Sequence, residues 1–233
     1  MNYKDRIDIR TFKTFFINVE SHLNKRLEVE DRLIRRGFES ISRIQAIENT
    51  VDGQIGLIET HATLLATLKV PFLLLEDDIE ILNYNFEVSI PNDCDVLYLG
   101  NSVWGEWDKK AKIGVDFNSI DGSPNILRVR NMLSCHAMLF LCQEYVDFCA
   151  KGLKEEITAG LPSISRIDQF YARTQHHYNI FALDFPIFFQ KHNSKSMTRN
   201  EKWTKNKLTD FNFKLFFFYN FLTRFTNFIW KLK

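Results

Sequence analysis

The sequence predicts an α/β fold with a mostly parallel central sheet flanked by helices. Short apolar runs typical of buried strands alternate with helical patterns through roughly the first hundred residues, which is the order of a sheet with crossover helices. The run at 72–75 is apolar without interruption, as expected of a strand buried on both faces. It leads directly into Glu76-Asp77-Asp78, and open α/β sheets bind ligands outside such strand ends.

The elements of the first half follow from periodicity and from the residues that end helices. Gly37 stands where glycine commonly ends a helix. Gly53 and Gly56 lie close together and predict a turn or loop before the next helix. The expected order is a strand at 14–19, a helix at 24–36, a strand at 42–47, a turn at 53–56, a helix at 57–69 and a strand at 95–100.

The second half begins with a long polar segment, 101–124, which contains Trp104 and Trp107. Ordered connections of this length are usually binding loops or lids, and tryptophans in such a loop suit stacking on a ring of a bound ligand. Half-buried loop tryptophans without a ligand are the alternative. The rest is expected as an apolar run at 131–140, helices at 143–153 and 169–175, and an apolar run at 178–189.

Charge and length divide the chain of 233 residues into a domain, 1–198, and a basic, aromatic-rich tail, 199–233. The tail holds eight Lys and Arg against two Asp and Glu, and 11 of the 33 aromatic residues. A basic helix with an apolar stripe fits the surface of a membrane. The alternative is a helix that packs on the domain or on a second subunit. The stripe comprises Phe211, Leu215, Phe218, Leu222, Phe225 and Ile229.

The cysteines and the amino terminus indicate a reducing compartment. No two cysteines form a C-x-x-C pair, and three of them, Cys135, Cys142 and Cys149, are spaced by seven, which predicts core positions on one helical face. The charged start of the chain has no apolar stretch behind it, and no apolar run is long enough to span a bilayer. We expect a cytoplasmic protein, free or peripheral on the cytoplasmic face of a membrane.

The three consecutive carboxylates predict a site for a hard divalent cation. Adjacent carboxylates repel one another, and a cation bound by oxygen ligands relieves that repulsion. The alternative is structural: Asp77 or Asp78 caps a following helix and Glu76 is solvated.

Four short segments follow one another in an informative order. The first is Phe16-Ile17-Asn18-Val19 followed by Lys25-Arg26, a strand and a basic loop. The glycine-to-histidine segment ending at His61 and the acidic Leu75-Glu76-Asp77-Asp78 come next. The C-terminal half adds Asp168, Pro186, Gln190 and the serines at 194 and 196. Together, in this order, they resemble glycosyltransferase family 25, which includes sugar transferases of lipopolysaccharide and collagen. Gln54, Thr60 and Leu27 depart from the family pattern, which leaves the donor open.

The resemblance implies a single Rossmann-like domain of the A-type glycosyltransferase fold and an inverting transfer from a nucleoside diphosphate sugar to a glycan, such as a lipopolysaccharide or another lipid-linked oligosaccharide. Mn²⁺ or Mg²⁺ would stabilise the departing diphosphate as a Lewis acid. The expected ligands of the cation are Asp77, Asp78 and His192. The expected donor-binding residues are Asn18, Lys25, Arg26, His61, Glu76, Asp77 and Gln190.

The inverting reaction requires a general base for the acceptor hydroxyl, and Asp168 is the candidate because it follows a loop with serine and proline and matches the family by position. The alternative for Asp168 is an N-cap of the helix that begins at Gln169. Structural alternatives also stand for other candidates: a solvated pair for Lys25 and Arg26, a core histidine for His61 and a surface histidine for His192. The acceptor candidates are Trp104 and Trp107.

Two other functions compete. The first is a sugar transferase that acts on modified bases in DNA, with the basic aromatic tail as a phosphate-binding surface. The second is a non-catalytic protein that binds glycans or serves as a membrane adaptor.

Overall fold

The computed structural model describes residues 6–50, 52–102, 104–105, 115–120, 123–160 and 166–190. These residues form α-helices α1 (Leu23–Arg35), α2 (Gly53–Leu65), α3 (Gln143–Thr158) and α4 (Ile167–Thr174). The strands are β1 (Ile7–Asp8), β2 (Lys13–Asn18), β3 (Ser40–Gln45), β4 (Phe72–Glu76), β5 (Ile79–Ile81), β6 (Glu87–Val88), β7 (Val96–Tyr98), β8 (Asp116–Ile120), β9 (Ser123–Arg130), β10 (Ala137–Phe140), β11 (Ile180–Leu183) and β12 (Phe188–Gln190). The predicted tail, 199–233, lies outside this description.

The main sheet has the strand order β3-β2-β4-β10-β7-β11-β9-β8, and two small sheets, β1-β6 and β12-β5, lie beside it. Its first three strands are parallel, as expected. The sheet as a whole is mixed rather than mostly parallel in its pairings, because β10 is inserted antiparallel between β4 and β7 and because β9 runs antiparallel to β8 and β11. The α/β class is thus correct, and the mixed sheet is the finding that the sequence pattern did not indicate.

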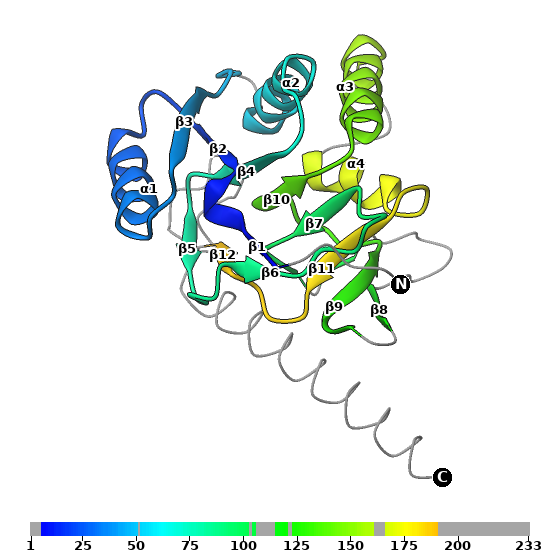
Figure 1. Ribbon diagram of the computed structural model, residues 1–233. Helices are drawn as coiled ribbons and strands as arrows, with labels where there is room; N and C mark the ends of the chain where they lie inside the picture. The colour runs from blue at the N-terminus through cyan, green and yellow to red at the C-terminus, as the bar shows by residue number, and fades with distance from the viewer. Residues whose placement is uncertain are drawn as a thin grey trace.

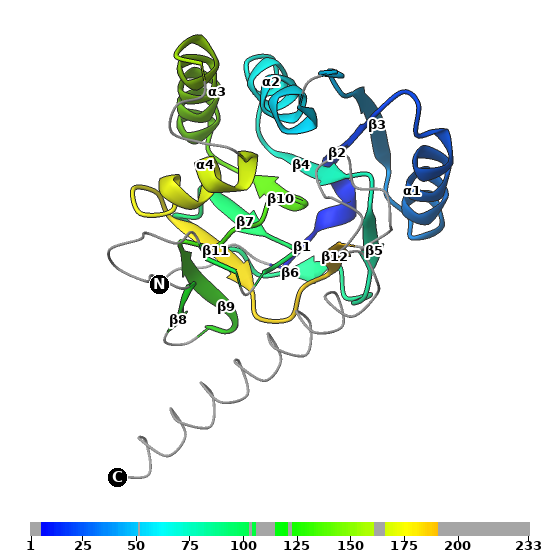
Figure 2. The ribbon, with the colours of Figure 1, turned by 180° about the vertical axis from the view of Figure 1, so that it is seen from behind.

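Helices cover the sheet unequally. Figures 1 and 2 show α2, α3 and α4 grouped together, with α1 set apart beside β3. Alternate residues of β4 enter two separate cores: Leu74 packs with the cluster that includes α2, α3 and α4, and Leu73 packs with the cluster that includes α1. Strand β4 is therefore buried on both faces, as its uninterrupted apolar run predicted.

The residues at the helix ends explain why the predicted end of α1 is close to the observed one and why the predicted start of α2 is not. Gly37, at φ +79°, ends α1, and the amides of Gly37 and Phe38 donate to the carbonyls of Ile34 and Leu33. The turn expected at 53–56 is wrong: α2 already begins at Gly53, because the Asp52 side chain accepts a hydrogen bond from the Gln54 amide at 2.8 Å. Within the described part of the chain, no helix is both long and apolar enough to cross a bilayer.

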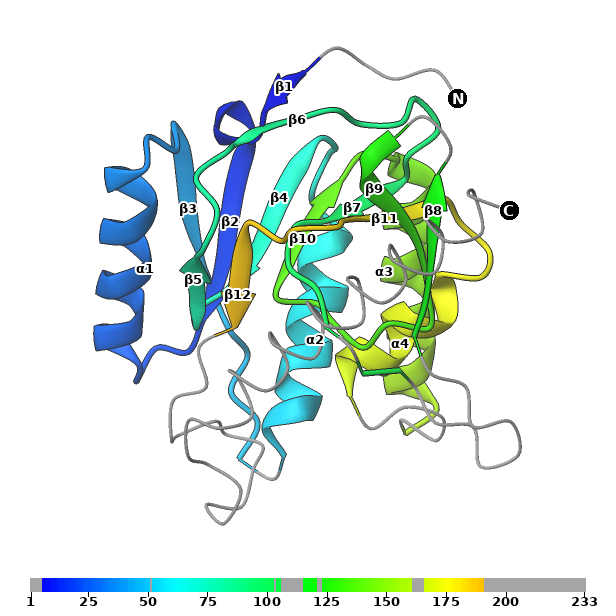
Figure 3. The same ribbon diagram turned by 90° about the horizontal axis from the view of Figure 1, so that it is seen from below.

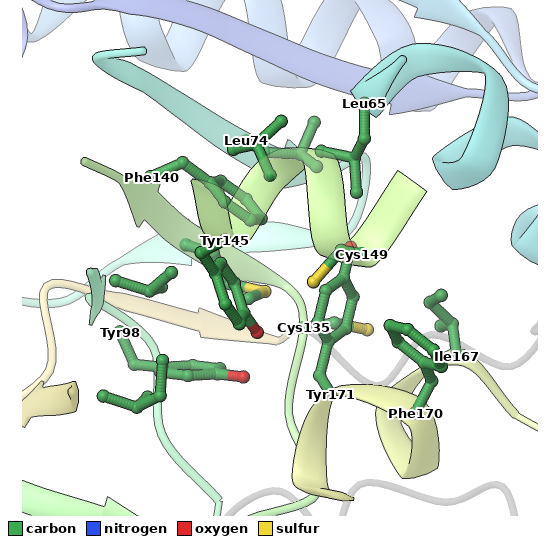
Figure 4. Close-up of a cluster of buried hydrophobic side chains, with 14 of the residues drawn as sticks. Leu65, Leu74, Tyr98, Cys135, Phe140, Tyr145, Cys149, Ile167, Phe170 and Tyr171 are labelled. Atoms are coloured by element: carbon green, nitrogen blue, oxygen red, sulfur yellow. The ribbon is translucent and has the colours of Figure 1, made fainter. Parts of the chain in front are cut away.

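The cysteines do not share one helical face. Only Cys149 lies within α3; Cys142 is its N-cap residue, and Cys135 precedes β10. The spacing of seven was a coincidence of a strand followed by a helix. Figure 4 shows Cys135 and Cys149 among the aromatic side chains of the core under α3 and α4, near Tyr145 and Tyr171. Both thiols are buried, and Cys135 has a further role described below.

Candidate functional site

The chain reverses its direction of winding at β2. From β2 the chain passes through α1 to β3 on one side, and then through α2 to β4 on the other side of β2. Helices α1 and α2 pack into the separate cores on the two faces. Figure 3 shows β3, β2 and β4 side by side, with α1 flanking β3. Ligands of open α/β sheets bind at such a reversal, outside the carboxyl ends of the strands.

The carboxyl ends of β2 and β4 bring predicted site residues together. Ile17 pairs with Glu76 in the parallel ladder, so Asn18 and Asp77 extend from neighbouring strand ends. The Asn18 amide nitrogen donates to Asp77 Oδ2 at 2.8 Å. Lys25, in the first turn of α1, donates to Asp77 Oδ1 at 3.2 Å, and His22 Nδ1 lies 4.0 Å from Oδ2. Both oxygens of Asp77 are thus held by nitrogen donors.

Glu76 and Asp78 form a second group beside Asp77. Gln190, at the end of β12, donates from Nε2 to Glu76 Oε2 at 3.1 Å and to Asp78 Oδ2 at 3.2 Å. The thiol of Cys135 donates to Glu76 Oε1 at 3.0 Å. Asp78 Oδ1 is buried and has no hydrogen-bond partner among the described residues. A buried carboxylate oxygen without a donor costs free energy, which a bound cation would offset.

The helix-capping alternatives for the acidic residues are wrong. Asp77 and Asp78 form a turn that leads into β5, a strand, so no helix follows for either carboxylate to cap. Asp168 does not precede α4 but lies within its first turn, and Arg166 occupies the N-cap position. Helix capping therefore explains neither the acidic turn at Asp77 and Asp78 nor Asp168.

Burial and mutual repulsion raise the pKa values of this acidic group. Burial, aided by the charge of Asp78, raises the pKa of Glu76 from 4.5 to about 8. Burial, aided by the charge of Asp77, raises the pKa of Asp78 from 3.8 to about 6. Burial therefore favours the protonated forms of both residues, and a cation bound beside them would favour their charged forms.

Asp168 belongs to the same electrostatic neighbourhood. Burial is the main cause of the raised pKa values of Glu76, the Cys135 thiol and the Tyr98 hydroxyl, and the charge of Asp168 contributes to each of the three shifts. The structure thus brings a carboxylate from α4 toward the acidic end of β4, although 92 residues separate Asp168 from Glu76 in the sequence.

The other candidates have different surroundings. Arg26 forms an ion pair with Glu30 at 3.0 Å on α1. His61 is 1% exposed, and its Nδ1 lies 2.8 Å from the Tyr171 hydroxyl; burial lowers its pKa to about 3. Among the described residues, no hydrogen bond or ion pair joins His61 to the three carboxylates, so its position is that of a neutral core histidine.

Trp104 lies beside the segment that reaches Glu76. It is 42% exposed, and its carbonyl accepts a hydrogen bond from the Leu133 amide at 2.8 Å, two residues before Cys135. The ring is therefore exposed on a segment whose backbone pairs with the segment that leads to Cys135. Trp107 and His192 lie outside the described residues.

Two residues of the site were missed from the sequence. Cys135 was interpreted only as a core residue, and Arg43 was passed over within a predicted strand. Arg43 donates to both oxygens of Asn18, at 3.1 Å and 3.3 Å. An arginine within a strand that pairs with a buried strand was a usable signal, because a buried charge requires a partner.

The donor set fits a cation that is shared with a substrate. Within the described residues, no three His, Cys, Asp or Glu side chains converge as a complete protein-built metal site requires. Mg²⁺ and similar cations that bind nucleotides take one or two protein carboxylates and complete their coordination with phosphate oxygens and water. Asp78, whose buried Oδ1 has no hydrogen-bond partner among the described residues, and Asp77 beside it could hold a cation in that mode.

No protein-family model matches this sequence, and no curated protein matches it either. The function proposed below therefore depends on the geometry of the site and on the resemblance of its motifs.

The raised pKa values predict that the metal-free protein loses stability as pH rises. Between about pH 5 and 8 the folded protein retains protons on Asp78 and Glu76 that the unfolded chain releases, so the free energy of unfolding falls through this window. We expect Glu76→Gln to be more stable than the wild type at pH 8 by about 1–2 kcal/mol, with a shallower pH dependence. Denaturation by urea at pH 5, 6.5 and 8 with a chelator measures this; equal slopes for both proteins would contradict it.

Proposed function

We propose that this protein is a metal-dependent inverting glycosyltransferase that moves a sugar from a nucleoside diphosphate sugar to a hydroxyl group of a glycan. One observation carries the proposal: the acidic turn after β4 lies at the winding reversal of the sheet, caps no helix, and includes a buried carboxylate oxygen, Asp78 Oδ1, without a hydrogen-bond partner among the described residues. The motif resemblance to family 25 supplies the substrate class.

The donor site is proposed around Asp77 and Asp78. A divalent cation bound there would supply Lewis acidity to the departing diphosphate. Lys25 lies within reach of the same carboxylate, and an ammonium group beside the cation site can meet a phosphate oxygen. Gln190 holds Glu76 and Asp78 in place, which makes it a supporting residue rather than a direct nucleotide contact.

Asp168 is proposed as the general base. An inverting transfer forms the new glycosidic bond in one displacement while the base takes the proton of the acceptor hydroxyl. The carboxylate comes from α4, a different element from the donor-binding turn, so an acceptor can lie between them. Trp104 offers an exposed ring for stacking on the acceptor sugar.

The finer fold assignment and the setting belong to the same proposal. Six of the eight strands in the main sheet run in one direction, only β9 and β10 being reversed, which supports a Rossmann-like sheet of the A-type glycosyltransferase kind. The basic, aromatic composition of 199–233 supports attachment to a membrane surface and a lipid-linked acceptor.

A binding screen tests the proposal. We expect one nucleoside diphosphate sugar with Mn²⁺ to raise the melting temperature of the wild type, because a ligand at 100 times its Kd stabilises the native state by about 2.7 kcal/mol. Asp78→Asn is expected to abolish this shift and to lower donor turnover by at least about 100-fold. Asp31→Asn, on the exposed face of α1, is the matched control and retains both.

Two outcomes contradict the proposal. Donor turnover that survives Asp78→Asn rules out the metal-dependent mechanism. A panel of nucleotides without any thermal shift rules out the transferase and favours the glycan-binding or adaptor function.

A further inference from the structure

The Asn18 side chain, on β2, connects β3 and the acidic turn by hydrogen bonds. It is 1% exposed, at the end of β2. Its amide nitrogen donates to Asp77 Oδ2 at 2.8 Å and to the His22 carbonyl at 3.2 Å. Its side-chain oxygen accepts from Arg43 Nε at 3.1 Å. Both the oxygen and the nitrogen of the amide therefore have hydrogen-bond partners, as buried polar groups usually do.

Arg43, on β3, donates hydrogen bonds to Asn18 from the side of β2 opposite Asp77. Besides the Asn18 side chain, its guanidinium donates to the Asn18 carbonyl at 3.3 Å. The same group forms an ion pair with Glu20 at 2.6 Å. The Arg43 side chain is 15% exposed, whereas the Glu20 side chain is 59% exposed, so the arginine, not the glutamate, is the fixed member of the pair.

The chemistry of the guanidinium determines which way the Asn18 amide faces. A guanidinium donates hydrogen bonds and accepts none, so the amide oxygen must face Arg43. The NH₂ group must then face Asp77. If the amide turned over, its oxygen would meet the carboxylate of Asp77 and its NH₂ would meet the guanidinium, and both contacts would become repulsive.

We propose that Arg43 is a positioning residue of the cation site, which acts through Asn18 to hold the Asp77 carboxylate in the orientation that binds a divalent cation. The inference rests on the proposed function for the identity of the cation site. Partners that orient a metal ligand typically change metal affinity by about 10–100-fold when they are removed.

The shape of the side chain, rather than its charge, performs this role. Two separate guanidinium nitrogens reach the two oxygens of Asn18, and a third contact reaches Glu20. Lysine would keep the positive charge beside Glu20 but offers one ammonium group without the planar fork. Arg43→Lys therefore separates positioning from simple charge compensation.

The experiment measures Mn²⁺ binding by isothermal titration calorimetry, without any turnover. We expect Arg43→Lys and Arg43→Met each to weaken Mn²⁺ binding by about tenfold. Asn18→Ala should weaken it by at least as much, and adding Arg43→Met to Asn18→Ala should weaken it no further, because Arg43 acts through Asn18. Arg128→Met on β9, which removes a contact to Asn179, is the matched control and binds Mn²⁺ like the wild type.

Two results would overturn the inference while the proposed function stands: wild-type affinity in Arg43→Lys, or an additive loss in the double variant. A wild type that binds Mn²⁺ neither alone nor with a nucleoside diphosphate would instead contradict the proposed function. In that case the positioning contact is measured from the equilibrium constant of unfolding. The factor by which Asp77→Asn changes this constant should differ by at least about threefold between the wild type and Arg43→Met. In the Asn18→Ala background, the factor should be the same with and without Arg43→Met. Absence of that coupling overturns the inference.

Discussion

Replacement of Asp168 by asparagine is expected to lower the rate of sugar transfer by about 10²–10⁴-fold while the affinity for the donor stays within about twofold. Asparagine keeps the shape of the side chain in the first turn of α4 but cannot accept the proton of the acceptor hydroxyl. The proposed donor site comprises residues of β2, α1 and the acidic turn, none of which the substitution removes. Single-turnover transfer and donor titration measure the two quantities separately.

The control for Asp168→Asn is Glu144→Gln. Glu144 is the acidic residue in the first turn of α3, so its replacement removes the same favourable interaction with a helix N-terminus. We expect Glu144→Gln to transfer sugar at the wild-type rate and to change stability by no more than about 1 kcal/mol. Transfer by Asp168→Asn at the wild-type rate would remove Asp168 from the role of base.

Local sequence signals located the main helices and strands of the first half, although not β1, β5 and β6, because each had an independent physical cause. The uninterrupted run of β4 required burial on both faces, and Gly37 provided the left-handed conformation that ends α1. The insertion of β10 between β4 and β7 could not be seen in the same way. Strand order depends on contacts between segments far apart in the chain, and an apolar run carries no mark of its direction.

The acidic turn was located from the sequence, but its surroundings were not. The three carboxylates are consecutive, so their proximity needed no fold, whereas Gln190 and Cys135 reach Glu76 only through tertiary structure. His61 is a different case: its place in a motif suggested a ligand contact, with a core histidine as the alternative, and the side chain is buried between α2 and α4 with a hydrogen bond to Tyr171. Buried polar residues must find partners, and the sequence does not identify them.

Replacement of Gly56 by alanine is expected to destabilise the protein by at least about 3 kcal/mol, although alanine in a helix interior ordinarily stabilises by about 1 kcal/mol relative to glycine. A Cβ atom at Gly56 would lie 2.2 Å from the Ile47 carbonyl oxygen and 3.0 Å from the Asn49 amide nitrogen. Both are backbone atoms of the segment that leaves β3, so neither can move aside by a rotamer change. Urea denaturation measures the loss.

The close packing at Gly56 also allows the Thr60 side chain to connect α2 by hydrogen bonds to the segment that follows β3. The Thr60 hydroxyl donates to the Gly56 carbonyl at 2.7 Å and accepts from the Ile47 amide at 2.8 Å. An added methyl group would push α2 away and break the second of these contacts, leaving a backbone donor without its partner. The loss is therefore expected to exceed that of steric strain alone.

Gly152→Ala in α3 is the matched control for Gly56→Ala. A Cβ atom at Gly152 would meet the ring of Phe170 at 2.9 Å, which is a side chain and can turn, rather than backbone. We expect this substitution to change the free energy of unfolding by no more than about 1 kcal/mol, because the helical gain of alanine offsets the adjustment of the ring. If both alanine variants keep the wild-type free energy of unfolding, the backbone contact between α2 and the segment after β3 does not constrain the fold. If only Gly56→Ala is destabilised, packing requires glycine at that position, whatever its place in a functional motif.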